Sequence, residues 1–487
     1  MKVSNFYKNT AILVISNVVT GTLNFLFSII LSRSIGPEGM GIYQLVMPLY
    51  TMFLFITGGG ITVAVSKIAA EKKALGRLRE LYKTVNILCI FEFIWSLLVV
   101  TILLFISKFI SNNIIKDART YYSILAFLPA LIIVSISSVV KGTYYGIQRV
   151  IEPAIIDVFE KIVRIAVMFP LLNLVKNISL ELSCASAVLA LSCGEASSLV
   201  LFYIFYSIYK RKHRTFEKTD NSLQLLFNTL KISTPLAFNG IFSTIFSMII
   251  AIIIPLRLQV AGFTHQQSLS MFGKVTGMAL NIIFYPAIIL NSLSVILIPS
   301  ISEALVQKDY RTVNRRIYKA LDVSALVSLA SMIILINFPE KIALTFYKDA
   351  SIAPMLKFLA FGMPLVYIEI ISFSILNALG KQKEIMINSL IISLSDLTIL
   401  YILLAIPNIN IYGYAINFII SAILGIVLSW IIVLSNYEFK FNMLSFIFSH
   451  SIAFFITLLL TKFIYIKLSN IYLLIISVYI TYIILKE

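Results

Sequence analysis

The chain has 487 residues, of which 59% are hydrophobic, and its formal net charge at pH 7 is +17. Apolar stretches of about 20 residues recur along its whole length, which excludes an ordinary soluble domain and predicts a polytopic helical membrane protein. The positive charges gather between these stretches, as the positive-inside rule requires, so we predict no nucleic-acid partner.

The apolar stretches predict an all-α membrane protein of about 14 transmembrane helices. With the N-terminus inside, the inner segments carry roughly twice as many Lys and Arg residues as the outer ones, so we expect both termini to be cytoplasmic. The predicted location is a membrane that the chain crosses many times. In chain order the predicted spans are residues 10–32, 44–66, 86–106, 121–140, 153–174, 183–207, 232–254, 276–300, 321–338, 358–379, 386–406, 412–434, 445–463 and 469–485.

The two halves of the chain carry similar landmarks. Pro129 and Pro364 are 235 residues apart, and Gln148 and Gln382 are 234 apart. Six spans per half is an even number, so the halves share one orientation, and a transport site is expected at their interface. We therefore predict two pseudo-symmetric six-helix lobes plus a C-terminal helix pair. The predicted parts are residues 1–209 (first lobe), 210–231 (basic cytoplasmic linker), 232–440 (second lobe) and 441–487 (extra hairpin).

Two glycine-rich segments interrupt the first spans. Residues 36–41 (Gly-Pro-Glu-Gly-Met-Gly) predict an outer loop with Glu38 in solvent. Residues 58–60 are three consecutive glycines, which favour a bend or a close helix contact over a ligand site.

A charged stripe lies in the predicted span 153–174. Asp157, Glu160, Lys161 and Arg164 are spaced so that they share one face of a helix, and Asp157–Lys161 and Glu160–Arg164 are possible i,i+4 pairs. Each charge near a helix centre costs about 2.5–3.5 kcal/mol on insertion scales, so the stripe must face protein or water. It predicts either the lining of a translocation path or an ion-pair ladder that locks helices together.

Several further acids fall inside predicted spans. Glu195, Glu369 and Asp396 are candidate ion-coupling residues, because carboxyl groups in pumps bind cations or relay protons. Glu92, among aromatic residues, is interpreted as a packing contact. These acids favour an alternative function, a Na⁺- or H⁺-coupled multidrug or cation antiporter.

The residues at 31–50, 58–71, 141–148 and 152–164 resemble the stage V sporulation protein B family, in the multidrug/oligosaccharidyl-lipid/polysaccharide exporter superfamily. The resemblance implies alternating-access export, across a bacterial plasma membrane, of a polyprenyl-pyrophosphate-linked glycan, a peptidoglycan precursor for the spore cortex. Lys161 and Arg164 would then attract the pyrophosphate, with Asp157 and Glu160 orienting them. Lipid II flippases of the superfamily resemble one another in cavity arginines of the first, second and eighth spans, which this chain lacks; its eighth span offers Asn281 as a polar substrate contact.

The sequence predicts a transporter and no enzyme, because it shows neither a phosphate-binding P-loop nor a nucleophile elbow. Its three cysteines and three histidines have no metal-ligand spacing, so no metal site and no cofactor are expected. The expected partners are the lipid-linked glycan and membrane lipids, and cell-wall synthesis proteins are candidates.

Overall fold

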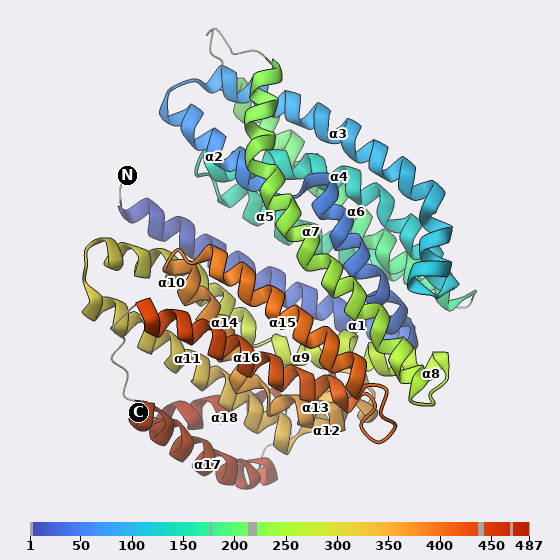
Figure 1. Cartoon of the computed structure of the whole chain (residues 1–487), viewed down its shortest axis with the longest axis vertical. Helices are drawn as coiled ribbons and strands as arrows, with labels where there is room; N and C mark the ends of the chain where they lie inside the picture. Colours follow the sequence, from blue (N-terminus) through green and yellow to red (C-terminus); the bar gives the residue numbers. More distant parts are fainter. Residues whose placement is uncertain (1–2, 176–177, 213–221, 437–442, 468–470, 487) are drawn as a thin grey trace. The chain divides into compact units, whose positions relative to one another are not determined.

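The computed structural model describes residues 3–175, 178–212, 222–436, 443–467 and 471–486, and within these ranges it contains helices and no strands (Figure 1). The chain divides into two compact units, Met1–Ile252 and Ile253–Glu487. The helices that begin in the first unit are α1 (Val3–Gly58), α2 (Ile61–Ala74), α3 (Leu78–Phe109), η1 (Ile110–Ile115), η2 (Ala118–Thr120), α4 (Tyr121–Gly146), α5 (Ile151–Val175), α6 (Leu180–Lys212) and α7 (Ser222–Val260). Those that begin in the second unit are α8 (His265–Phe272), η3 (Gly273–Ala279), α9 (Leu280–Phe284), α10 (Ala287–Val306), α11 (Tyr310–Asn337), α12 (Pro339–Tyr347), η4 (Ala350–Ile352), α13 (Ala353–Ala360), α14 (Met363–Ala378), α15 (Gln382–Leu403), α16 (Tyr412–Asn436), α17 (Met443–Lys467) and α18 (Ile471–Lys486).

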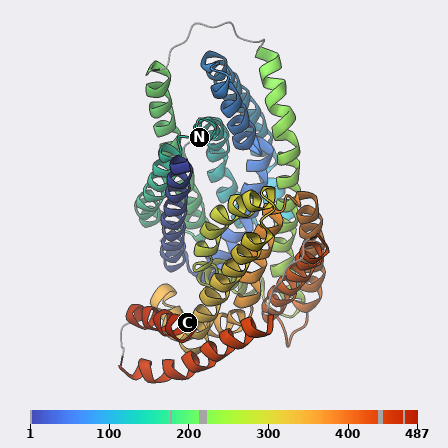
Figure 2. The same ribbon diagram turned by 90° about the vertical axis from the view of Figure 1, so that its left-hand side faces the viewer.

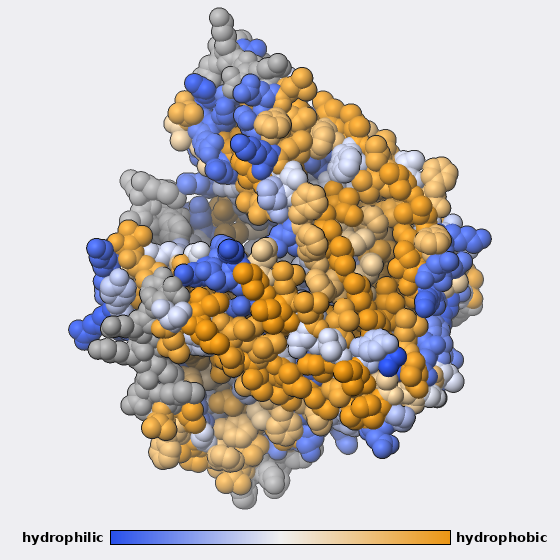
Figure 3. All heavy atoms as spheres, viewed as in Figure 1, coloured by the Kyte–Doolittle hydropathy of each residue, from blue (hydrophilic) through white to orange (hydrophobic). Residues whose placement is uncertain are grey.

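The all-α membrane fold is confirmed. Within the described residues, nine helices are long and apolar enough to cross a membrane, or ten if one bent helix pair forms a single span. A count of about 14 is compatible with this, because Lys8–Ala74 is 67 residues long, α5 is apolar apart from its charged stripe, and two shorter apolar helices follow near the C-terminus. Figure 3 shows hydrophobic side chains along the sides of the helices and hydrophilic ones toward their ends.

The segment predicted as an outer loop is instead a kink within α1. Gly36 has φ 69° and ψ −178°, the one non-helical residue of that helix, and Pro37 begins the next helical turn. The prediction that Glu38 is solvated is wrong: its Oε1 lies 2.6 Å from Nη1 of Arg119, which also binds Asp117. An ion pair to a residue about 80 positions away is invisible to local composition.

The glycine triplet breaks the chain between α1 and α2. Gly60 is left-handed, with φ 74°, and a Cβ atom there would lie 2.6 Å from the carbonyl oxygen of Ser233 on α7. A Cβ at Gly59 would lie 3.0 Å from Ala237 on the same helix. The triplet therefore provides both a bend and a close helix contact.

The two units repeat one pattern of helix packing, which confirms the pseudo-symmetric lobes. In the first unit α4 packs against α2, α3 and α6, and α5 packs against α6; in the second, α14 packs against α10, α11 and α16, and α15 against α16. Figures 1 and 2 show these helices running alongside one another within each unit. The residue limits predicted for the lobes and the linker stay predictions; α7 begins at Ser222 and runs past the division of the units.

Left-handed residues at helix ends define the register of the repeat. Three pairs of them are each separated by 232 residues: Gly76 and Lys308, Lys116 and Lys348, and Gln148 and Gly380. The same backbone hydrogen bonds close the helices before Gln148 and Gly380, a Schellman-type end. The true offset is therefore two residues shorter than the distance between Gln148 and Gln382.

The sequence matches residues 155–160 with residues 391–396 and so pairs Glu160 with Asp396, but the structural register changes this pairing. Asp396 lies sixteen residues after Gly380, as Arg164 lies sixteen residues after Gln148. Counted from the helix ends, Asp396 thus corresponds to Arg164 and not to Glu160. The repeat places an acid in one lobe where the other has a base.

The C-terminal hairpin of α17 and α18 packs against α11 in the second unit. A buried polar cluster joins them. Nε2 of His450 lies 3.1 Å from Asp322 Oδ1, its Nδ1 lies 2.9 Å from the hydroxyl of Tyr482, and Lys486 Nζ lies 2.5 Å from Asp322 Oδ2. Asp322 is thus the shared acceptor that ties both hairpin helices to the lobe.

Replacing Asp322 with Asn should loosen the hairpin. The change removes the charge that holds Lys486 and His450, and hydrogen bonds to charged groups contribute roughly 1.5–3 kcal/mol each. We expect a lower midpoint of thermal unfolding in detergent and faster proteolysis of the protein. Glu303→Gln, an exposed carboxylate of the same unit, is the control, and equal stability of the two variants would contradict this role.

Candidate functional site

The site begins with a close contact between α2 and α4. Gly142 and Gly146 are four residues apart, so they share one face of α4. A Cβ atom at Gly142 would lie 2.6 Å from the carbonyl oxygen of Thr62, and one at Gly146 would collide with Ser66. Small residues at this spacing let two helix backbones approach. The contact fixes the neighbouring Lys141 beside α2 and α5.

A polar cavity of about 410 Å³ lies among the helices of the first unit. Its walls come from α1, α2, α4, α5 and α6. The lining residues that carry charge are Asp157, Glu160, Glu195, Lys141 and Lys161. The uncharged polar ones are Thr20, Asn24, Thr62, Ser137, Ser138 and Ser198.

The ion pairs in this cavity differ from the i,i+4 pairs that the stripe suggested. Asp157 binds Lys141 of α4, with Nζ 2.8 Å from both carboxylate oxygens. Lys161 pairs with the adjacent Glu160. Asp157 pairs with Lys141 and not with Lys161, because Lys141 on α4 reaches Asp157 from across the cavity.

Arg164 does not line the cavity but lies buried beside it, 8% exposed. Its Nη2 donates to the hydroxyl of Tyr43 at 3.0 Å, and its guanidinium carbon lies 3.9 Å from the centre of the Phe27 ring. Both partners belong to α1, so Arg164 joins α5 to α1. Cation–π contacts of this kind strengthen when they are removed from water.

Glu160 on α5 and Glu195 on α6 line the same cavity and interact electrostatically. A Cβ atom at Gly194 would lie 3.0 Å from Oε1 of Glu160, so only a glycine fits without a shift. Oε1 of Glu160 is buried without a hydrogen-bond partner. Glu195 interacts electrostatically with Glu160, Lys161, Lys141 and Arg164. The predicted cargo and coupling residues of the first lobe therefore form one cluster.

Sequence reasoning missed Lys141. The apolar run of the predicted span 121–140 ends at Val140, so the sequence places Lys141 in the inner connection that follows. The signal that could have found it is the Gly142–Gly146 spacing, which extends the helix and its packing face beyond the apolar run.

The other two candidate ion-coupling residues, Glu369 and Asp396, form a second cluster in the second unit. Asp396 on α15 accepts hydrogen bonds from Asn417, at 3.1 Å, and from Ser421, both on α16. Glu369 on α14 interacts electrostatically with Asp396 and lies against Gly425, where a Cβ atom would collide with it. No Lys or Arg in the described part of the chain forms an ion pair with either acid.

Asn281 belongs to neither cluster. It lies on α9 of the second unit and donates to the carbonyl oxygen of Gly277, one turn earlier in the chain. Among the residues that the structure describes, no group of three or more His, Cys, Asp or Glu side chains could hold a metal ion.

The polar cavity of the first unit contains two lysines, Lys141 and Lys161, whose charges are balanced by carboxylates of the protein. Three carboxylates and two ammonium groups share this small cavity inside the protein, where paired charges interact more strongly than in bulk water. An anionic group that entered could exchange with a carboxylate as the partner of a lysine, whereas an isolated cation would be costly to maintain.

Comparison with known protein families identifies the family to which the chain belongs. A family described as "Polysaccharide biosynthesis protein" matches residues 6–304, and a second family with the same description matches residues 282–485. The chain belongs to the polysaccharide biosynthesis protein family. It is similar to stage V sporulation protein B of Bacillus subtilis (strain 168), at 28% identity over 87% of this chain and 82% of that protein. Lipid II flippase MurJ of the same organism is 23% identical over 78% of this chain and 74% of the flippase.

Solved structures share the fold of this family member. A lipid II flippase MurJ in an inward closed conformation matches with a TM-score of 0.69 and 18% identity, covering 98% of each chain. An inward-facing multidrug resistance MATE family transporter matches with a TM-score of 0.67 and 14% identity, covering 85% of this chain and 95% of that one. At these identities the likeness shows the fold and leaves the cargo open.

Proposed function

We propose that the protein is an alternating-access flippase that moves a polyprenyl-pyrophosphate-linked glycan, a peptidoglycan precursor for the spore cortex, across the plasma membrane. The observation that carries the proposal is the first-unit cavity, where Lys141 is paired with Asp157 and Lys161 with Glu160. The family, and relatives named as a sporulation protein and a lipid II flippase, support the choice of cargo.

The lysines act as the anion contacts in this proposal. The pyrophosphate would replace Asp157 beside Lys141 and Glu160 beside Lys161, forming charge-assisted hydrogen bonds of the same kind. When the cargo leaves, Asp157 pairs with Lys141 again and Glu160 with Lys161, so neither lysine is left as an unpaired charge inside the membrane. Arg164 supports this arrangement from behind, by holding α5 against α1.

The direct test is the transfer of fluorescent lipid II across the bilayer of liposomes that contain the purified protein. No transfer above that of protein-free liposomes would refute the proposal.

We also propose that both termini are cytoplasmic, because the inner segments are the more basic. In a variant without native cysteines, a membrane-impermeant thiol reagent applied from outside should label Lys348→Cys and not Arg315→Cys, both at exposed positions. The reverse pattern would overturn the orientation.

A second candidate function, coupling to a cation gradient, rests on the acidic cluster of the second unit. Asp396 there is surrounded by neutral hydrogen-bond donors and a second acid, an arrangement suited to Na⁺ or H⁺. If it couples transport, Asp396→Asn should abolish the stimulation of transport by a Na⁺ or pH gradient. Gradient stimulation that survives in Asp396→Asn, and that equals that of Glu303→Gln, would exclude this role.

A further inference from the structure

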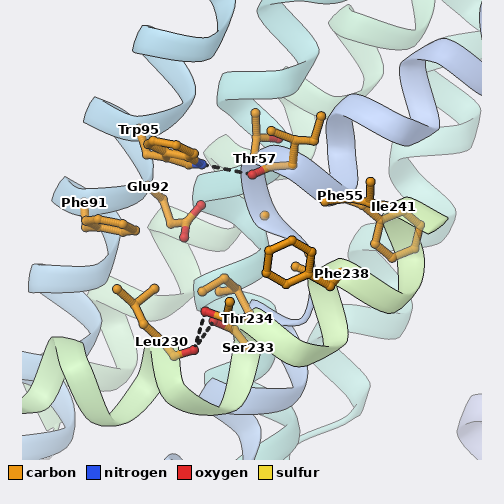
Figure 4. Close-up of a pocket in the computed structure, with 15 residues that line it drawn as sticks. Phe55, Thr57, Phe91, Glu92, Trp95, Leu230, Ser233, Thr234, Phe238 and Ile241 are labelled. Carbon is orange, nitrogen blue, oxygen red and sulfur yellow. Dashed lines mark hydrogen bonds between the residues drawn. The ribbon is translucent and has the colours of Figure 1, made fainter. Parts of the chain in front are cut away.

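A second cavity of the first unit shares no lining residue with the polar one. It has a volume of about 320 Å³ and lies between the α1–α2 junction, α3 and α7 (Figure 4). This is at the lower end of the range for small-molecule pockets, roughly 300–1,000 Å³. Its aromatic lining residues are Phe55, Phe91, Trp95 and Phe238.

One ionisable side chain enters this aromatic cavity. Glu92 is 1% exposed, and its carboxyl group points from α3 toward the space before α7 in Figure 4. Its buried Oε2 has no hydrogen-bond partner, and the described residues place no ion pair on either oxygen. A buried carboxyl group without a partner is costly, so this side chain calls for a ligand.

The neighbouring polar groups are already used. Thr57 donates to the carbonyl oxygen of Phe53, and Ser233 and Thr234 donate to that of Leu230. The indole N–H of Trp95 donates to the carbonyl oxygen of Ile56 at 2.9 Å. None of these groups therefore has a donor left for the Glu92 carboxyl group. The aromatic rings that line the cavity surround it instead.

We propose that this cavity binds an amphiphilic organic cation, with one protonated amine on Glu92 and an apolar body against the aromatic rings. An ammonium group gains from a carboxylate and from ring faces together, and it needs no further oxygen ligands. A metal ion would require several oxygen ligands, and a lipid chain would leave the carboxyl group unpaired.

The ligand enters from the lipid side. Phe238 is 59% exposed and Trp95 39% exposed, and both lie on apolar stretches of their helices. The cavity therefore opens between these two exposed side chains. An amine with a long apolar body concentrates in the membrane, next to this opening. The site is independent of the flippase cargo, because it uses another cavity and the opposite charge.

The test measures binding of dansylcadaverine, a fluorescent primary amine, to the full chain in lipid nanodiscs, with empty nanodiscs subtracted. We expect saturable binding that Glu92→Gln weakens by about tenfold or more, because it removes the only charge opposite the amine. Phe238→Leu should weaken binding about threefold by removing a ring face. Glu71→Gln, an exposed carboxylate of the same unit, should bind as the wild type does.

The N-acetylated probe, which is neutral, separates the alternatives. Loss of binding on acetylation, together with loss in Glu92→Gln, supports the proposal. Equal binding of both probes, unchanged affinity in Glu92→Gln, or no saturable binding to the wild type would each overturn it. Phe238→Leu gives a second measurement should Glu92→Gln unfold at a lower temperature than the wild type.

Discussion

Lys141→Gln should reduce transport of a lipid-linked glycan by about tenfold or more, the loss expected for one charge-assisted contact to a pyrophosphate. The ammonium group lies 2.8 Å from both oxygens of Asp157 and lines the cavity, where it is the cation that joins α4 to α5. Lys141→Arg keeps the charge with a different shape and should retain partial transport. Lys67→Gln, an exposed lysine of α2, is the control and should transport normally.

A double variant separates cargo binding from structure. If Lys141 only neutralises Asp157, then Lys141→Gln combined with Asp157→Asn removes both charges and should restore transport. If Lys141 binds the cargo, the double variant should fold well and remain inactive. Restored transport would contradict the proposed role of Lys141.

Arg164→Ala should have the largest effect on stability, a loss of about 3–5 kcal/mol, as when one partner of a buried charge network is removed. The change breaks the hydrogen bond to Tyr43 and the contact with Phe27, and it leaves the carboxyl group of Glu195 with less positive charge nearby. The expected observations are a lower unfolding midpoint in detergent and less protein in the membrane.

The conservative variants show which contact matters. Arg164→Lys keeps the charge and loses the planar group that covers Phe27, so its stability should lie between wild type and Arg164→Ala. Tyr43→Phe removes one hydrogen bond and should cost about 1–2 kcal/mol. Normal folding of Arg164→Ala with complete loss of transport would instead place Arg164 among the cargo contacts.

The sequence was sufficient for the fold and for the main face of the site. Helical periodicity placed Asp157, Glu160 and Lys161 on one face of α5, and the structure brings all three into one cavity. The cost of a charge in lipid was the physical reason to look there.

The partners of those charges could not be predicted from local spacing. An i,i+4 rule describes one isolated helix, whereas Asp157 is satisfied by Lys141 on the facing helix. Arg164 similarly bonds Tyr43, 121 residues earlier in the chain. Such contacts depend on which helices pack together, and local spacing does not reveal that packing. The close glycine contacts of α4 with α2 and of α6 with α5 are part of it.

The register of the internal repeat also could not be predicted from side chains alone. Matching side chains gave an offset of 234 or 235 residues, but the left-handed helix ends give 232. Backbone geometry at a helix end is independent of side-chain identity, since a lysine or glutamine in one lobe occupies the conformation of a glycine in the other. The shorter offset aligns Asp396 with Arg164, so the two lobes carry opposite charges at equivalent positions.

The measurement that tests the central claim most directly is lipid II transfer by liposomes containing wild-type protein, Lys141→Gln or Lys67→Gln. A membrane-impermeant quencher reports the fraction of fluorescent head groups in the outer leaflet over time. The account predicts rapid equilibration between leaflets for wild type and Lys67→Gln, and a rate slower by about tenfold or more for Lys141→Gln. Equal rates in all three samples, or rates no faster than in empty liposomes while a cationic dye is transported, would contradict it.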